Sequence, residues 1–277
     1  MPRRSIILLV LSGALACAPA SPDHGAPNGD GTALATFDAH SDGAEPFSVD
    51  VLFPAQSNGA AQPGPFPGAV LLADDGVDPS SYRWLGQALA EQGFVVALPG
   101  LSLGKASVDP ERANVSRDLL LSNRGLLKGL VTDRVALLAH GASGETALHQ
   151  AVNGPFNALG LLATAPQSGD EAEKLGVPSL VVVGTSDCAL SSADAHQGWS
   201  RLPSPSVFVQ LAGATHAQFT DDESADLADC EPGTSLQLAH ADIAAAVGDF
   251  LRFSLSNDAT SLEALQGDTF GVTVESQ

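Results

Sequence analysis

The sequence is poor in positive charge. Its 277 residues include 12 Lys and Arg against 32 Asp and Glu, which gives a net charge of −20. Nucleic acids and anionic membrane surfaces are recognised through clustered positive charge, so we expect neither as a partner. Charged residues make up only 16% of the chain, whereas apolar residues make up 44%. This balance excludes a globally disordered chain and predicts a packed core.

The apolar run near the N-terminus is too short to cross a bilayer, which takes ~20 apolar residues. It follows Arg3-Arg4 and leads into small residues that end at Cys17, as in a secretory signal peptide. We therefore expect residues 1–16 to be a signal peptide and the protein to be exported. Cys17 follows Ala14-Leu15-Ala16 and resembles a bacterial lipobox, which predicts a cell-envelope lipoprotein whose lipid is its only membrane contact. Plain secretion is the alternative.

Cysteine is scarce, with three residues in the chain. Besides Cys17 there are Cys188 and Cys230, and in an oxidising compartment this pair is predicted to form a disulfide. Two free buried thiols are the alternative. Because no His/Cys cluster has the spacing of metal ligands, we expect no metal site and no cofactor.

Strand and helix patterns alternate along most of the chain. Fully apolar segments such as Gly68–Ala73, Arg134–Ala139 and Leu180–Val183 are typical of buried strands, and helical periodicity lies between them. Phe47–Phe53 alternates apolar and polar residues, as an outer antiparallel strand does. The pattern predicts an α/β fold whose mostly parallel central sheet is covered by helices on both faces.

The domain boundaries follow from composition. Residues 17–34 are rich in Ala, Pro, Ser, Gly and Asp and are predicted to be a flexible tether. The folded domain is expected over 35–253. Residues 254–277 are polar and are predicted to be a frayed C-terminal tail with a weak strand-like stretch at Phe270–Val274.

Chemistry-bearing residues come directly after several of the predicted strands. In sheets of this kind, ligands lie at the carboxyl ends of the strands. The candidate site residues are therefore Asp74-Asp75-Gly76, His140-Gly141-Ala142-Ser143-Gly144, Asp187 and His216.

Several motifs resemble those of the α/β-hydrolase family, over roughly residues 45–253. They are Pro79-Ser-Ser-Tyr-Arg-Trp-Leu-Gly86, Ala165-Pro-Gln167, Val183-Gly-Thr-Ser-Asp187 and Gly213-Ala-Thr-His-Ala-Gln-Phe219. The branch that they resemble holds the dienelactone-hydrolase-like and cutinase-like polyester hydrolases. The resemblance implies the α/β-hydrolase fold and a small ester-like ligand.

The resemblance implies a nucleophile, an acid and a histidine in that chain order. Asp187 matches the acid and His216 matches the base, the acid fixing the tautomer of the imidazole. Turn and loop roles are the alternative for these two residues.

The nucleophile position is altered. The strand alignment places Gly141 at the family's nucleophile elbow, and glycine has no oxygen with which to attack, although it suits a strained bend. A shifted elbow with Ser143 as the nucleophile is the alternative. Ser143 also fits the N-cap of a helix that begins near Glu145.

The oxyanion hole implied by the resemblance consists of the backbone N–H groups of Asp75 and Ala142. The carboxylates of Asp74 and Asp75 would work against a developing oxyanion there. They are interpreted as turn residues, with cation binding as an alternative. Aromatic residues make up only 5% of the chain, which argues against an aromatic cleft for a polymer.

Two main functions follow from these features. The first is an exported α/β-hydrolase-family protein that is catalytically impaired because Gly141 occupies the nucleophile position. The second is an active carboxylic-ester hydrolase that uses Ser143, His216 and Asp187. A purely structural surface protein is a third.

Overall fold

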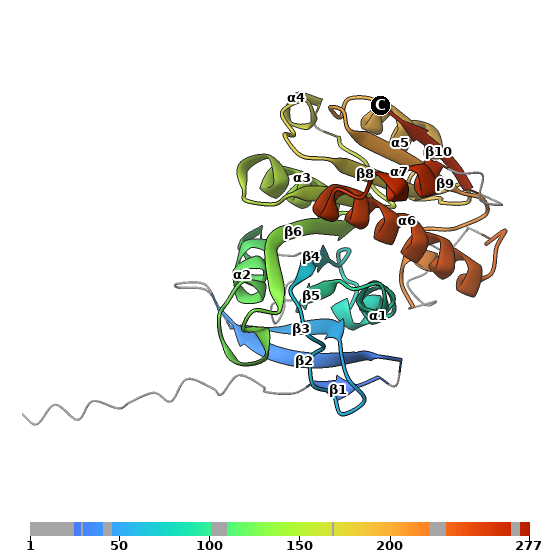
Figure 1. Ribbon diagram of the computed structural model, residues 1–277. Helices are drawn as coiled ribbons and strands as arrows, with labels where there is room; N and C mark the ends of the chain where they lie inside the picture. Colours follow the sequence, from blue (N-terminus) through green and yellow to red (C-terminus); the bar gives the residue numbers. More distant parts are fainter. Residues whose placement is uncertain are drawn as a thin grey trace, which may run out of the picture.

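A central sheet of ten strands runs through the part of the chain that the computed structural model describes, residues 25–28, 30–40, 46–100, 110–167, 169–221, 231–266 and 272–277. The strands are β1 (Ala26–Pro27), β2 (Thr32–Ala39), β3 (Phe47–Pro54), β4 (Phe66–Leu72), β5 (Val95–Pro99), β6 (Val131–His140), β7 (Ala158–Leu162), β8 (Ser179–Gly184), β9 (Ser206–Leu211) and β10 (Val272–Ser276). Their order in the sheet is β1-β2-β3-β5-β4-β6-β7-β8-β9-β10 (Figure 1).

The middle of the sheet is parallel and its ends are antiparallel. Strands β5, β4, β6, β7, β8 and β9 pair in parallel. Strands β1, β2 and β3 join one end antiparallel, and β10 joins the other. The predicted α/β-hydrolase fold class, with a mostly parallel sheet, is confirmed. Phe47–Phe53 is an antiparallel strand as expected, but β2 and β1 lie outside it.

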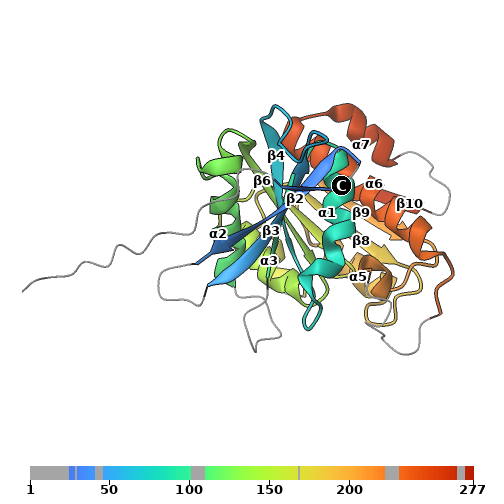
Figure 2. The same ribbon diagram turned by 90° about the horizontal axis from the view of Figure 1, so that it is seen from below.

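Helices cover both faces of the sheet. They are α1 (Arg83–Glu91), α2 (Pro110–Leu120), α3 (Ser143–Asn153), α4 (Gly169–Ala172), α5 (Ser192–Trp199), α6 (Leu236–Ser256) and α7 (Ala259–Gln266). Short 3-10 turns occur at η1 (Pro79–Tyr82), η2 (Gly125–Leu127) and η3 (Ala217–Phe219). Figure 2 shows the sheet from its edge, with α2 and α3 on one side and α1 and α6 on the other.

The alternation of side chains along each strand produces two separate apolar cores. In β4, Val70 belongs to the core that α2, α3 and α5 cover, whereas Leu71 belongs to the core under α1 and α6. Neighbouring side chains of a strand point to opposite faces, so a strand buried on both faces is apolar throughout, as the sequence pattern predicted.

Several predicted boundaries are wrong. Residues 26–27 and 32–34, assigned to the tether, form β1 and the start of β2. The predicted tail contains the end of α6, the helix α7 and the strand β10. The tail was predicted to be frayed because its sequence is polar. In the structure, α7 packs on α6 and β10 pairs with β9.

Three predictions concern residues outside the described part of the chain. The signal peptide at residues 1–16, the lipidation site Cys17 and one disulfide partner, Cys230, all lie there. Export, lipidation and the Cys188–Cys230 bond therefore stay predictions. Within the described residues, none of the helices has both the length and the apolar character needed to cross a membrane.

The carboxyl ends of the parallel strands position the candidate site. In the register between β4 and β6, Leu72 is opposite Ala139, so the residues that follow these two strands emerge side by side. Asp187 follows β8 and His216 follows β9, the two parallel strands toward the other end of the sheet. Residues that are distant in sequence therefore meet at one edge, as expected for open α/β sheets.

Candidate functional site

A sharp bend connects β6 to α3, and Gly141 is at its apex. The φ angle of Gly141 is 55°, in the left-handed region that is unfavourable for other L-residues. The bend is closed by hydrogen bonds from the Gly141 N–H to the Leu162 carbonyl, at 3.1 Å, and from the Gly144 N–H to the Gly141 carbonyl, at 3.0 Å. This geometry matches the expected elbow, and the residue at its crown has no side chain.

The carboxylate of Asp74 fills the space beside Gly141. A Cβ atom built on Gly141 would overlap this carboxylate. Asp74 Oδ1 accepts hydrogen bonds from the backbone N–H of Ala142, at 2.7 Å, and from the N–H of Asp75, at 2.8 Å. These are the two N–H groups that the sequence predicted for the oxyanion hole. Both therefore point at one oxygen position, and a carboxylate of the protein itself occupies it.

The position of Asp74 also follows from helix electrostatics. The N–H of Ala142 precedes the first residue of α3, where the unpaired N–H groups of a helix favour negative charge. The backbone N–H of Asp74 donates to the Tyr82 hydroxyl at 3.0 Å, which fixes the loop after β4. Asp74 is a turn residue, as interpreted, because its carbonyl accepts a hydrogen bond from the N–H of Val77 at 3.2 Å, but its side chain also binds to the neighbouring elbow.

His216 lies between two carboxylates. Its Nδ1 is 3.0 Å from Asp187 Oδ2, and its Nε2 is 3.2 Å from Asp74 Oδ2. The Asp187 side chain is fully buried, and its Oδ1 accepts from the N–H groups of Ala189 and Leu190 at 2.8 and 2.9 Å. The structure thus brings the predicted acid and histidine together, and it adds a second carboxylate where a nucleophile's oxygen is expected.

This arrangement changes the protonation of the site. Burial opposes a charge on His216, but its hydrogen bonds to Asp187 and Asp74 outweigh burial and raise the pKa of His216 to about 9. Burial also opposes ionisation of Asp74, yet the hydrogen bond from His216 and the backbone N–H bonds lower the pKa of this carboxyl. At neutral pH, His216 is therefore an imidazolium that donates to two carboxylates.

A second histidine, His140, ends β6 directly before the bend. It is 1% exposed, and its ring centroid is 4.5 Å from that of His216. The Tyr82 hydroxyl lies 2.7 Å from His140 Nδ1. Burial, together with the nearby charge of His216, lowers the pKa of His140 to about 3, so this imidazole is neutral.

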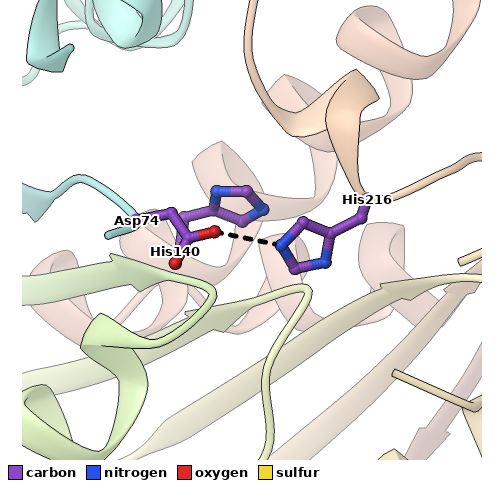
Figure 3. Close-up of side chains that lie close together, drawn as sticks. All are labelled: Asp74, His140 and His216. Atoms are coloured by element: carbon purple, nitrogen blue, oxygen red, sulfur yellow. Dashed lines mark hydrogen bonds and ion pairs between the residues drawn. The ribbon is translucent and has the colours of Figure 1, made fainter. Parts of the chain in front are cut away.

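His140 Nε2 is buried and makes no hydrogen bond of ordinary geometry with the described residues. The interaction of this ring with the backbone of His216 favours its charged form, but burial outweighs that effect on the pKa of His140. Figure 3 shows the two imidazole rings and the Asp74 carboxylate gathered at one point. In the sequence, His140 stands out only as part of the elbow motif, because a histidine at the end of an apolar strand carries no signal of its partners.

Ser143 was also interpreted as the N-cap of the helix that follows the bend, and this interpretation is wrong. Helix α3 begins at Ser143 itself, and its N-cap Ala142 has no side-chain capping bond. The Ser143 side chain is buried, and its hydroxyl donates to the carbonyl oxygen of Ala73. That bond connects the first turn of α3 to the end of β4. Both ring nitrogens of His216 are bonded to carboxylates, so Ser143 is bonded to neither of them.

Comparison with known proteins identifies a family that matches this chain. A family model described as alpha/beta hydrolase family matches residues 68–224. The matched segment includes Asp74, the bend at Gly141, Asp187 and His216, and it is more than half of the chain. The comparison with curated proteins finds no match.

Proposed function

Since the chain belongs to the alpha/beta hydrolase family, we propose that it is an exported member that does not carry out serine-dependent ester hydrolysis. Within the family, we place it near the dienelactone-hydrolase-like and cutinase-like branch, on the motifs around Ala165-Pro-Gln167 and Asp187. In this proposal, the protein is an exported binding or scaffold protein that keeps the hydrolase fold.

One observation carries the proposal. The Asp74 carboxylate stands beside Gly141, where the nucleophile's side chain would be, and it takes the N–H groups of Ala142 and Asp75. An acyl substrate needs a nucleophilic oxygen at the bend and free donors for its oxyanion. Here the nucleophilic oxygen is missing, and the oxyanion donors are already bonded to the Asp74 carboxylate.

Ester hydrolysis by Ser143, His216 and Asp187 is the alternative. It requires the Ser143 hydroxyl to give its proton to His216 Nε2. In the structure, that hydroxyl is bonded to the Ala73 carbonyl, and His216 Nε2 is bonded to Asp74. Activity through Ser143 would therefore need both hydrogen bonds to break and the first turn of α3 to rearrange.

A covalent serine probe tests the proposal directly. We expect the purified full chain to show no labelling by a fluorophosphonate and no hydrolysis of short p-nitrophenyl esters above the buffer rate. The matched control is Ser143→Ala, which should behave identically in both assays. Labelling that peptide mapping assigns to Ser143, and that Ser143→Ala abolishes, would establish the esterase alternative instead.

A further inference from the structure

Asp74, His140 and His216 form a cluster of potential metal ligands, a property that ester chemistry does not use. Its three potential ligand atoms come from the loop after β4, the end of β6 and the loop after β9, and they all lie within 4.8 Å of one another. We propose that these three residues bind one divalent transition-metal ion, with zinc as the favoured metal. The inference goes beyond the proposed loss of ester hydrolysis, which does not depend on it.

The donor set suits such an ion. Two imidazoles and one carboxylate are ligands that zinc takes in three-ligand protein sites, with bonds of about 2.0–2.2 Å. Two atoms bonded at ~2.1 Å in tetrahedral geometry lie about 3.4 Å apart. Asp74 Oδ2 and His216 Nε2 are already 3.2 Å apart. Since no pair is more than 4.8 Å apart, the widest pair needs to approach by at most about 1.4 Å.

Each proposed ligand is also held by an outer partner, as is usual for metal-binding side chains. The other nitrogen of His216 is bonded to Asp187 Oδ2, which produces a carboxylate–histidine pair directed at the site. The other nitrogen of His140 is bonded to the Tyr82 hydroxyl. These partners hold the Nδ1 atom of each ring, so Nε2 is the atom of each ring that would bind the ion.

The second oxygen of Asp74 has its own partners. Asp74 Oδ1 accepts from the N–H groups of Ala142 and Asp75, which leaves Oδ2 for the metal. On binding, the metal replaces the proton on His216 Nε2, and that proton leaves to solvent. His140 binds through the Nε2 lone pair and keeps its proton on Nδ1, where the Tyr82 oxygen accepts it.

Burial favours a small cation over a larger ligand. The side chains of His216 and Asp74 are 11% and 18% exposed, and His140 Nε2 is buried without a hydrogen bond of ordinary geometry. Buried charges in proteins are paired or coordinate a metal. A three-ligand site leaves one coordination position for water, and the chain's net charge of −20 raises the local concentration of cations.

Metal titration of the purified full chain, after chelator treatment, tests the proposal. We expect one equivalent of Co²⁺ to bind with the visible absorption of a four-coordinate site, one equivalent of Zn²⁺ to displace it, and Zn²⁺ to raise the melting temperature. Changing an outer partner of a zinc ligand typically weakens binding about 10–100-fold. We therefore expect Asp74→Asn and His140→Gln to lose at least that much affinity, with circular dichroism confirming that they fold.

The matched control is His149→Gln, which removes a surface histidine that pairs with Glu171. It should bind one equivalent with unchanged affinity. The proposal is overturned if the folded wild-type chain takes up no Co²⁺ or Zn²⁺. It is equally overturned if Asp74→Asn and His140→Gln bind as the wild type does, since the metal then lies elsewhere. Neither result depends on the serine-probe experiment.

Discussion

The carboxylate of Asp74 stands where a side chain on Gly141 would begin. The two residues follow different strands, β4 and β6, whose ends are neighbours in the sheet. A glycine at the bend gives the carboxylate its space, and the carboxylate in turn bonds the N–H groups at the start of α3. The two features belong together, so changing either one alone should be unfavourable.

Gly141→Ser on its own should destabilise the protein without producing activity. A non-glycine residue at a φ of 55° costs about 1–2 kcal/mol, and displacing the Asp74 carboxylate adds to that cost. Urea unfolding measures the loss, and a fluorophosphonate measures labelling. A stable Gly141→Ser variant that hydrolyses esters would contradict the overlap with Asp74.

The double variant Gly141→Ser with Asp74→Ala should gain a reactivity that neither single variant has, although the backbone strain at position 141 remains. Removing the carboxylate makes space for the new hydroxyl, frees the N–H groups of Ala142 and Asp75, and leaves His216 Nε2 to accept the proton from the serine. We expect probe labelling at position 141 in the double variant and none in either single variant. An unlabelled but folded double variant would show that the oxyanion donors or the His216 geometry do not fit catalysis.

Ser143→Ala should lower the free energy of unfolding by about 1–3 kcal/mol, because it leaves the buried carbonyl of Ala73 without its donor. Chemical denaturation measures this change. Ser143→Thr is the useful companion, since it keeps a hydroxyl but adds a methyl group in a buried position. If Ser143→Ala leaves stability unchanged, the bond to Ala73 contributes nothing to the joint between β4 and α3.

Stability of the metal-free protein should decline as the pH rises from about 6.5 to about 9. The folded-state pKa of His216 is raised to about 9 from an ordinary value of 6.5. Its contribution is therefore fully present below pH 6.5 and is lost as the pH passes through the folded value. The groups that face this ring are the carboxylates of Asp187 and Asp74 and the neutral His140.

The full shift corresponds to roughly 3 kcal/mol at most. Urea unfolding at a series of pH values in chelator-containing buffer measures it, and His216→Gln supplies the control, because this part of the pH dependence should disappear. An NMR titration of the imidazole signals of His216 gives its pKa independently. A value near 6.5 would show that the two carboxylates do not hold the charged form.

Cys17→Ser should release the protein from membranes if the lipobox interpretation is correct. A lipidated chain partitions into the detergent phase of a cloud-point separation, whereas the variant should remain in the aqueous phase. Ser21→Ala is the matched control, because it changes a residue of the predicted tether and leaves Cys17 in place. A wild-type chain that is aqueous throughout would favour plain secretion.

The strand pattern predicted the fold and much of the site, because a sheet buried on both faces produces continuous apolar runs and places the residues after each run at one edge. Asp187 and His216 could be located in this way, whereas their roles and the place of Gly141 at the bend came from the resemblance to the α/β-hydrolase family. The role of Asp74 could not. Its contact with Ala142 joins residues that are 68 positions apart, and an aspartate after a strand looks the same whether it serves a turn or a neighbouring loop.

Helix α7 was not predicted, and β10 was expected only as a weak strand-like stretch at Phe270–Val274, for a different reason. Helix α7 and strand β10 each pack on the rest of the domain along one side, so their sequences are mixed rather than apolar. The partners of His140 were equally hidden, because Tyr82 reaches it from the 3-10 turn η1, 58 positions earlier in the chain. Local patterns report burial well, but they do not report which side chains meet.

Strand β10 has a consequence for how copies of this protein behave toward one another. It pairs with β9 over Val272–Ser276 and is continued by the hydrogen bonds between Gln277 and Ser206. Without it, β9 would present an apolar row and a ladder of unpaired N–H and C=O groups, which is a template for sheet-to-sheet aggregation. The short β10, which ends in Glu275-Ser276, pairs with that ladder and becomes the edge strand in place of β9. Short edge strands that carry charged side chains are poorer templates for such pairing.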